Sequence, residues 1–306
     1  MDLGQVSEYC YNLTNSYLEI KNQTQVIADT QDAIRLTKRY FLQDIFPRWS
    51  PLSCEISFSY NGGKDCQVLL LLYLGCIWEF FLNSVQDSQY DRQYHQYPLR
   101  SLPTVFIDQE ETFATMEDFV ASTSERYCLS LYESVRDEGK KLSMPEAFDQ
   151  YLKLHSDTKA IVIGIRYTDP YAADLKTIQP TDDDWPDFLR LQPLLHWKLS
   201  NIWSFLLFSN EPICGIYGMG FTSIGSIKNT LPNPHLNVDR KDKPSLLFQW
   251  EIAHAFGKTD DQDPEVNVSQ VNHKDLALLN NSNEKYLPGW YLTDDSLERA
   301  GRVKRC

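Results

Sequence analysis

The chain has 306 residues, enough for one large domain with an extension, and it carries 29 basic against 42 acidic residues. The resulting net charge of −13 argues against a nucleic acid as partner, because most of the surface would repel a polyanion. Seven scattered cysteines without a Cys-x-x-Cys pair argue against a disulfide framework, a zinc ribbon and an iron–sulfur site.

These features predict a cytoplasmic protein that works without a membrane and without an obligate protein partner. The odd number of cysteines fits a reducing compartment. The first twenty residues carry acids and polar groups and lack the basic-then-apolar pattern of a signal peptide. The longest apolar run, residues 68–82, contains Glu79 and is shorter than a bilayer requires, so it predicts a buried helix.

In chain order, the residues first predict a helical segment. Residues 1–50 have apolar side chains at helical spacing, and Pro47 and Pro51 end the segment. A short apolar strand, 55–59, then runs into two glycines and a very apolar helix. Further strands are expected at 103–108, 128–134 and 160–165, and further helices at 115–127, 145–155 and 200–210.

This alternation predicts an α/β fold with a mainly parallel sheet and helices on both of its faces. The strand at 160–165 is apolar on both faces, as a covered parallel strand must be. We expect three parts: an N-terminal helical segment (1–50), a nucleotide-binding core (51–230) and a loop-rich extension (231–306). Ligands bind parallel sheets at the carboxyl ends of the strands, so the polar segments that follow the strands are the candidate sites.

The first of these segments, "SYNGGKD" (residues 59–65), favours a phosphate site. Two glycines between a strand and a helix let backbone amides approach an anion, and the helix N-terminus adds positive charge. The alternative is a tight turn that needs glycine only for its dihedral angles. The P-loop of NTPases is excluded because Asp65 follows Lys64 where that motif has a hydroxyl, and the G-x-G-x-x-G fingerprint is absent.

The pattern Ser59-x-x-Gly62-Gly63-x-Asp65 resembles the pyrophosphate loop, S-x-G-G-x-D-S, of enzymes that cut ATP between its α and β phosphates. Cys66 stands where that loop ends in serine, and Asn61 is an additional residue. "LPTVFIDQEETF", "GIR", "LQPLLHWKLSNIWSFL" and "EPICGIYGMGFTSIG" are similar to the phosphoadenylylsulfate (PAPS) reductase group. The resemblance implies a modified Rossmann-like fold of the adenine nucleotide alpha hydrolase type.

Within this superfamily, "TDDDWPDFLRLQP" and "LERAGR" resemble the eukaryotic, fungal-type FAD synthetases, which are FMN adenylyltransferases. A PAPS reductase needs a nucleophilic cysteine in a Glu-Cys-Gly context near its C-terminus. Cys214 lies mid-chain, where a packed cysteine is the plainer interpretation, and Cys306 lacks the motif. A reductase or sulfate-adenylyl enzyme of the same fold, and a silent adenine-nucleotide binder, remain alternatives.

The resemblance implies that AMP is transferred from ATP to the phosphate of FMN, giving FAD and pyrophosphate with the help of Mg²⁺. It implies catalytic roles for Asn61, Asp65, Asp169 and Arg299, with Asp65 and Asp169 as the candidate Mg²⁺ ligands. The expected ATP contacts are Ser59, Tyr60, Gly62, Gly63 and Lys64 at the phosphates, Ile107 and Asp108 at the adenosine, and Gly164, Ile165 and Arg166 at the end of the third strand.

For FMN, the face of Trp185 could stack on the isoalloxazine ring, and acids around it could accept the ring N–H. The alternative for Trp185 is core packing, and for the basic C-terminal cluster it is plain solvation. Arginines would bind the FMN phosphate, and the C-terminal extension would help to close this site. The expected FMN residues are Asp182, Asp183, Asp184, Trp185, Asp187, Arg190, Arg299 and Arg302.

Overall fold

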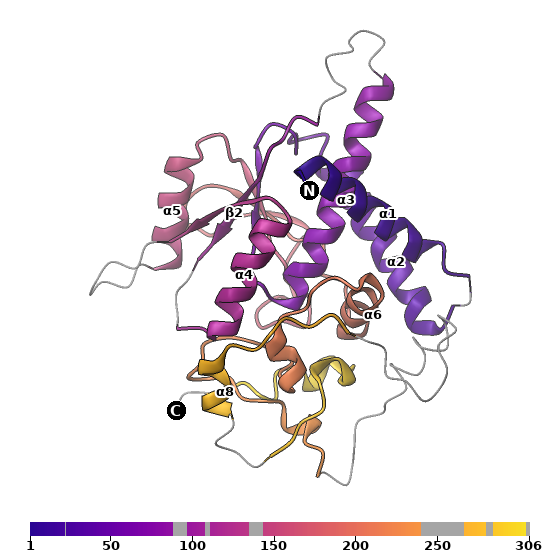
Figure 1. The fold of residues 1–306 in the computed structure, drawn as a ribbon. Helices are drawn as coiled ribbons and strands as arrows, with labels where there is room; N and C mark the ends of the chain where they lie inside the picture. Colours follow the sequence, from indigo (N-terminus) through magenta and orange to yellow (C-terminus); the bar gives the residue numbers. More distant parts are fainter. Residues whose placement is uncertain are drawn as a thin grey trace.

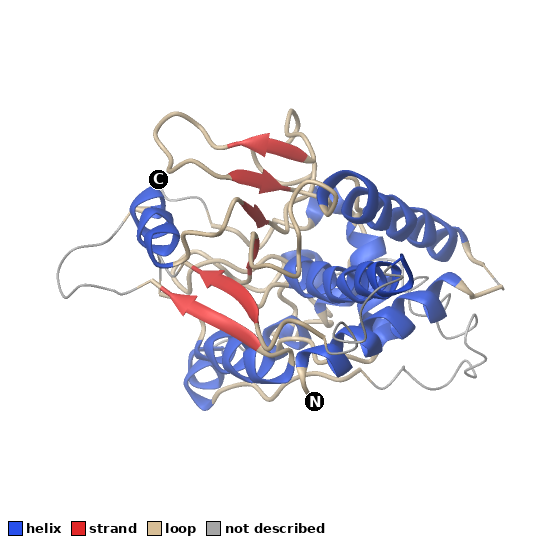
Figure 2. Ribbon diagram, turned by 90° about the horizontal axis from the view of Figure 1, so that it is seen from above, coloured by secondary structure: helices blue, strands red, loops and turns tan. Residues whose placement is uncertain are grey.

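The computed structural model describes residues 1–21, 23–87, 97–107, 111–134, 143–239, 266–279 and 284–303. Its centre is a six-stranded sheet with the strand order β3-β2-β1-β4-β6-β5 (Figures 1 and 2). All neighbouring strands are parallel except β5 and β6, which confirms the predicted mainly parallel sheet. The strands are β1 (Ile56–Ser59), β2 (Leu102–Phe106), β3 (Leu129–Glu133), β4 (Ala160–Val162), β5 (Ile178–Pro180) and β6 (Leu189–Leu191).

Helices cover both faces of this sheet, because successive residues of β1, β2 and β4 are buried on both faces. Ile56 and Phe58 of β1 join the large apolar cluster that also contains α3 (Lys64–Asp87) and α4 (Ala114–Arg126). Val105 and Ile161 point to the other face and pack with α5 (Met144–Leu154) in a second cluster. Because β1, β2 and β4 run in the same direction, their carboxyl ends meet at one edge of the sheet.

The N-terminal segment forms two helices rather than one continuous stretch. Helix α1 (Leu3–Leu18) packs along α3, and α2 (Gln25–Arg39) packs against α6 (Leu199–Ser209) before ending in a π-helical turn, Tyr40–Ile45. Gly75 of α3 allows the close crossing with α1, because a Cβ there would lie 3.1 Å from the carbonyl oxygen of Cys10. These helices therefore bury the apolar surface of α3.

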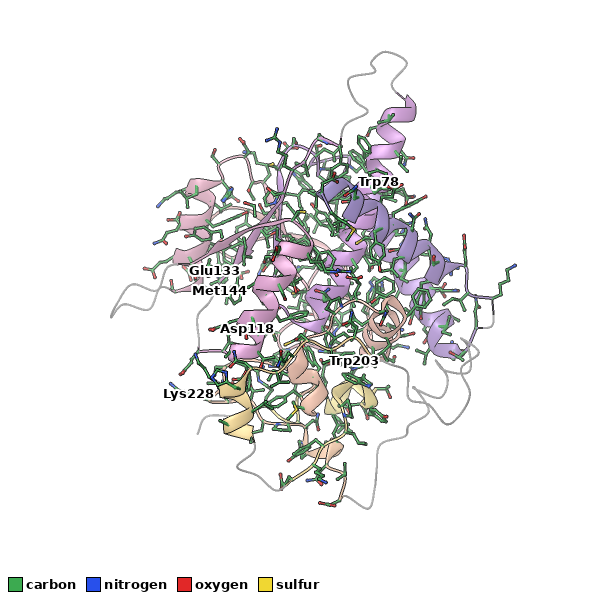
Figure 3. All side chains as sticks on the ribbon, viewed as in Figure 1. Trp78, Asp118, Glu133, Met144, Trp203 and Lys228 are labelled. Carbon is green, nitrogen blue, oxygen red and sulfur yellow. The ribbon has the colours of Figure 1, made fainter. Side chains whose placement is uncertain are left out.

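Helix α3 is the core helix of the molecule. Among the described helices, α3 alone is long and apolar enough to cross a bilayer, judged by length and composition. However, 61% of its most apolar 18-residue stretch is buried inside the fold. In the same core, Trp203 of α6 is fully buried (Figure 3). Its ring packs edge to face on Tyr217 and Trp290. The apolar run predicted as a buried helix is confirmed as one.

The extension wraps back onto the core through its side chains and single bridges. It contains the short helices α8 (His273–Leu279), Gly289–Tyr291 and Asp295–Leu297. Asp275 accepts hydrogen bonds from the backbone N–H groups of Ala114 and Thr115 and so occupies the N-terminus of α4. Bridges also join Ile213 to Val268 and Thr230 to Arg302. Segments far apart in the sequence thus meet beside the pyrophosphate loop.

The hairpin of β5 and β6 was not predicted from the sequence. Each strand has three residues, too short for a period-two pattern, and the connection contains four aspartates and Pro186. The predicted strands 103–108 and 160–165 exist as the shorter β2 and β4, and the predicted strand 128–134 exists as β3. The expected helix at 200–210 begins at Leu199, one residue earlier.

Candidate active site

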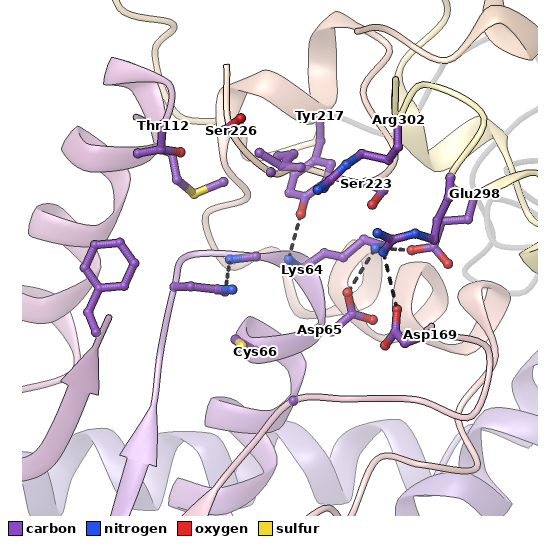
Figure 4. A pocket seen from close by; sticks show the side chains of 18 of the residues that line it. Lys64, Asp65, Cys66, Thr112, Asp169, Tyr217, Ser223, Ser226, Glu298 and Arg302 are labelled. Carbon is purple, nitrogen blue, oxygen red and sulfur yellow. Dashed lines mark hydrogen bonds and ion pairs between the residues drawn. The ribbon is translucent and has the colours of Figure 1, made fainter. Parts of the chain in front are cut away.

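A cavity of about 340 Å³ lies at the carboxyl ends of β1, β2 and β4, where α3 begins (Figure 4). Three chain regions converge on it: the loops after the strands, the segment that follows α6, and the C-terminal extension. The lining residues are Asn61, Gly63, Lys64, Asp65, Cys66, Phe106, Ile107, Thr112, Met116, Gly164, Asp169, Tyr217, Ser223, Ile224, Gly225, Ser226, Glu298, Arg299 and Arg302.

The glycine turn has the geometry of an anion site. Gly62 has φ +74°, and a Cβ there would lie 2.6 Å from Sδ of Met116, so glycine is required on both grounds. The N–H of Gly63 donates to Oδ1 of Asn61 at 3.0 Å, and the N–H of Lys64 donates to the hydroxyl of Tyr217 at 2.9 Å. The backbone donors at the N-terminus of α3 thus face the cavity.

Ser59 and Tyr60 support this turn from behind. Ser59 is the last residue of β1, and the fully buried Tyr60 donates its hydroxyl to Gln67 at 2.6 Å. Neither residue lines the cavity, and their contact with phosphate stays a prediction.

A buried network of opposite charges connects the loop to the extension. Nζ of Lys64 lies 2.9 Å from Asp65 and 2.5 Å from Glu298. The guanidinium of Arg166 pairs with Asp65, Asp295 and Glu298 at 2.6, 2.9 and 2.5 Å. Its contact with Asp65 is an ion pair without hydrogen-bond geometry. Two cations of the core are therefore held between acids of the core and acids of the extension.

The charges in this network stabilise one another against burial. Burial alone would lower the pKa of Lys64, but Asp65 and Glu298 outweigh it and raise that pKa above its usual value. Burial likewise opposes the carboxylate of Asp65, yet Arg166 and Lys64 lower its pKa to about 2. Lys64 and Asp65 consequently both stay ionised at neutral pH.

This arrangement sets the direction of Lys64 and the position of Arg166. The ammonium of Lys64 points toward Glu298, whereas the backbone N–H of this residue donates to the hydroxyl of Tyr217, which lines the cavity. Arg166 is fully buried and does not line the cavity, although it was predicted as a nucleotide contact. Gly164 does line it, and a Cβ there would lie 3.0 Å from Sγ of Cys66. Ile165 is half-buried beside them.

Asp169 faces the cavity from the loop after β4. One of its oxygens, Oδ2, accepts the backbone N–H of Arg166 at 2.9 Å, and Oδ1 lies 3.8 Å from the guanidinium of Arg299. Burial raises the pKa of Asp169, although the hydrogen bond from Arg166 works the other way. Arg302 reaches the same cavity across Gly225, where a Cβ would lie 2.1 Å from its guanidinium. The structure thus brings Asp169, Arg299 and Arg302 to one cavity, and their predicted roles stay predictions.

The predicted adenosine contacts are described only in part. Ile107 lines the cavity together with Phe106, at the end of β2. Asp108 lies outside the described residues, as do Glu110 and Cys306. The apolar wall is completed by Met116 of α4.

The acidic loop predicted to bind FMN is the connection between β5 and β6. Arg190 binds Asp182 at 3.2 Å and the carbonyl of Pro180 at 2.9 Å, and Trp185 packs on Phe148 of α5 with ring centroids 5.7 Å apart. None of the predicted residues of this loop lines the cavity, and the same holds for Arg190. Trp185 and Ile107 pack against the same apolar cluster, and Ile107 lines the cavity.

Thiolate chemistry finds no support among the described cysteines. All six of them are free, and burial raises the pKa of both Cys66 and Cys214 to about 12. The described cysteine in the cavity is therefore a neutral packing group, seated against Gly164.

The polar and charged residues that were not predicted include Tyr217 and Glu298, which line the cavity, and Asp295, which pairs with Arg166 behind it. Tyr217 belongs to the quoted segment "EPICGIYGMGFTSIG", and Glu298 directly precedes Arg299 in "LERAGR". The motifs marked these regions, but a buried partner for Lys64 and Arg166 cannot be identified before the chain is folded.

The fold and the cavity define a nucleotide-binding protein of the pyrophosphate-loop type, and comparisons with known proteins agree. The phosphoadenosine phosphosulfate reductase domain family matches residues 55–232. The flavin adenine dinucleotide synthase of Saccharomyces cerevisiae is 60% identical over 306 residues, which cover 99% of this chain and 100% of that protein.

Two crystal structures extend the comparison to three dimensions. Yeast FAD synthetase in complex with FAD has a TM-score of 0.87 at 59% identity, with 99% of this chain and 100% of that chain covered. Candida glabrata FMN adenylyltransferase in complex with FMN and the ATP analogue AMPCPP has a TM-score of 0.87 at 52% identity, with 100% and 99% covered. The chain belongs to the phosphoadenosine phosphosulfate reductase domain family and, within it, to the FAD synthases.

Proposed function

We propose that this chain is an FMN adenylyltransferase that transfers AMP from ATP to the phosphate of FMN, releasing pyrophosphate. The observation that carries the proposal is the convergence of the pyrophosphate loop, Asp169 and two arginines of the extension on one cavity. The identity of 60% over the full length with a flavin adenine dinucleotide synthase supports the choice of flavin over sulfur substrates.

The reaction is an in-line displacement at the α-phosphorus of ATP. An oxygen of the FMN phosphate forms the new bond to phosphorus, the bond to the bridging oxygen breaks, and its electron pair leaves with pyrophosphate. The FMN phosphate is already an oxyanion at neutral pH, so no strong base is needed. The protein contributes positioning and charge stabilisation: the amides of Gly63 and Lys64 hold ATP phosphates, and Arg299 and Arg302 offset the charge of the reacting phosphates.

The donors present fit a Mg²⁺ ion that is shared with the substrate. Among the described residues no three metal-ligating side chains converge, and Mg²⁺ in such enzymes typically takes one or two carboxylates plus phosphate oxygens. Asp169 fits best, because its Oδ1 is held only by Arg299 at 3.8 Å. Asp65 is a weaker candidate, because both of its oxygens contact cations. Bound there, Mg²⁺ would neutralise phosphate charge.

For the flavin ring we propose the surface between Ile107 and the acidic loop that carries Trp185. Both residues pack against the same cluster, so a ring beside Ile107 would reach the neighbourhood of Trp185. In this proposal Asp182, Asp183, Asp184 and Asp187 supply acceptors for the ring, and Arg190 holds the loop in shape through Asp182. We also propose a cytoplasmic location, since all described cysteines are free.

The test mixes purified protein with ATP, Mg²⁺ and FMN and follows FAD by chromatography alongside pyrophosphate. We expect equal amounts of FAD and pyrophosphate, and neither product when riboflavin replaces FMN, because riboflavin lacks the attacking phosphate. Replacing FMN by adenylylated sulfur with a thiol reductant tests the alternative reductase. Sulfite release without FAD synthesis would overturn the proposed acceptor.

A further inference from the structure

Tyr217 lies over the pyrophosphate loop, on the short helix Gly215–Met219 that follows α6 (Figure 4). Its side chain is 2% exposed, and its ring packs edge to face on Trp203 with centroids 5.4 Å apart. Nζ of Lys64 lies 5.9 Å from the ring centroid. The packing around the ring fixes where its hydroxyl points, which is toward the first turn of α3 and into the cavity.

The hydroxyl of Tyr217 uses only half of its hydrogen-bonding capacity. Its oxygen accepts the backbone N–H of Lys64 at 2.9 Å. For its own proton, no acceptor exists among the residues that the structure describes. Burial raises the pKa of Tyr217 well above its usual value, so the proton stays on the oxygen at neutral pH and remains available as a donor.

The hydroxyl of Tyr217 lies beside the N-terminus of α3, where the fold forms a site suited to an anion. The N–H of Lys64 is one of the amides at the N-terminus of α3, a helix of 24 residues, that have no acceptor within the helix, and such amides bind phosphate. The segment that follows α6 carries a second hydroxyl with an unused hydrogen bond. Ser226 is 5% exposed and lines the cavity, and its Oγ has no hydrogen-bond partner in the described structure. Buried hydroxyls are normally paired, so both indicate a ligand that supplies acceptor oxygens.

We infer that the hydroxyl of Tyr217 is a direct ligand of the phosphates that the loop binds, and that it donates a hydrogen bond to an oxygen of the departing pyrophosphate. The inference rests on the proposed function, whose leaving group is pyrophosphate. In the structure, the hydroxyl oxygen of Tyr217 accepts the hydrogen bond of the Lys64 amide. A phosphate oxygen that approaches this amide therefore comes within reach of the tyrosine proton. Because negative charge grows on pyrophosphate as the bond to the α-phosphorus breaks, the donor stabilises the transition state more than bound ATP.

The competing interpretation is a purely structural cap, in which Tyr217 satisfies the amide of Lys64 and does nothing else. Tyr217→Phe separates the two, because it removes the hydroxyl and leaves the ring packing on Trp203 in place. A structural cap predicts lower thermal stability with unchanged affinity for phosphates. A ligand predicts weaker binding of ATP and pyrophosphate and a lower kcat.

The experiment measures binding of ATP and of inorganic pyrophosphate by calorimetry in the absence of FMN, then kcat and KM for ATP with FMN present. Tyr73→Phe is the matched control, because Tyr73 is also a fully buried tyrosine whose hydroxyl has no partner, but it lies in α3 away from the cavity. For Tyr217→Phe we expect a loss of about ten- to a hundredfold in pyrophosphate affinity and in kcat, the range for a hydrogen bond to a charged group. Tyr73→Phe should bind and turn over as the unmodified chain does.

The inference is overturned if Tyr217→Phe binds ATP and pyrophosphate like the unmodified chain. Failure of the proposed function is a distinct result: without FAD synthesis, a selective loss of ATP and pyrophosphate binding in Tyr217→Phe would still support the ligand. Should that variant not fold, the ultraviolet difference spectrum of the unmodified chain on adding pyrophosphate gives the answer. A tyrosine red shift that Tyr73→Phe retains supports the ligand, and a flat spectrum contradicts it.

Discussion

Two of the three chain regions that line the cavity form walls that are built in different ways. The core wall is a strand, two glycines and a helix N-terminus, so its donors are backbone amides whose positions follow from the chain path. The wall from the extension consists of charged side chains on a single turn, Asp295 to Arg302, that is attached through ion pairs to Lys64 and Arg166. The core wall therefore depends on backbone geometry, and the wall from the extension depends on buried charge.

The largest effect is expected from a change in the backbone wall, Gly62→Ala. The residue has φ +74°, and its new Cβ would lie 2.6 Å from Sδ of Met116 and 2.8 Å from Val120. The left-handed conformation and the overpacking together should destabilise the fold by at least about 2 kcal/mol and move the amides that hold phosphate. We expect FAD synthesis to fall more than a hundredfold, measured as kcat/KM for ATP.

Gly218→Ala is the matched control for this prediction. Gly218 lies beside the cavity, but a Cβ there would make only ordinary contacts, the nearest at 3.6 Å to Val268. This variant should keep most of its activity and its melting temperature. Equal losses in the two variants would mean that the region tolerates no added carbon at all, and the argument from the glycine turn would fail.

The wall of the extension should respond to a change of charge without a change of shape, as in Glu298→Gln. The two oxygens of Glu298 join Lys64 to Arg166, and its side chain is 6% exposed. Removal of one partner from a buried ion pair leaves the others uncompensated, so we expect a loss of about 3 kcal/mol in the free energy of unfolding. Arg299 and Arg302 lie on the same turn, so kcat should fall more than tenfold as well.

The control for Glu298 is Glu211→Gln, which changes an equally buried carboxylate elsewhere. Glu211 accepts hydrogen bonds from Arg126, Tyr127 and Tyr9 and does not line the cavity. Both variants should unfold at lower urea concentrations. Only Glu298→Gln should lose turnover per folded molecule, and a normal kcat in that variant would show that the arginines keep their places without the network.

The same contrast explains what the sequence could predict. The glycine turn could be recognised because two local rules, strand–loop–helix order and glycine conformation, act on seven consecutive residues, and Gly62 does have a positive φ. Asp169, Arg299 and Arg302 were placed by motif resemblance and do meet in the cavity. Asp295 and Glu298 could not be found, because their role depends on contacts more than a hundred residues away along the chain.

Arg166 and the hairpin show two other limits of sequence reasoning. A strand-end arginine was expected to face the nucleotide, but three carboxylates from two segments, the glycine turn and the extension, hold it in the interior. The strands β5 and β6 form because they extend the sheet beyond β4. This is a tertiary effect, and segments of three residues carry no sequence pattern that would predict it. The role of Trp185 and its acidic loop in binding flavin stays a prediction.

The smallest effect concerns Asp65, which belongs to the backbone wall but shares both cations with the other wall. Because the folded pKa of Asp65 is about 2 against an ordinary value of 3.8, its carboxylate stabilises the fold by about 2 kcal/mol above pH 4. The sign follows from the lowered pKa: the unfolded chain takes up the proton first, so this stability is lost as the pH falls from about 4 toward 2. Asp65→Asn should therefore differ from the unmodified chain by a constant amount in urea unfolding between pH 5 and 7, and by progressively less below pH 4. A difference that persists undiminished at pH 3 would mean that the hydrogen bond from Lys64, rather than the charge of Asp65, joins the two walls.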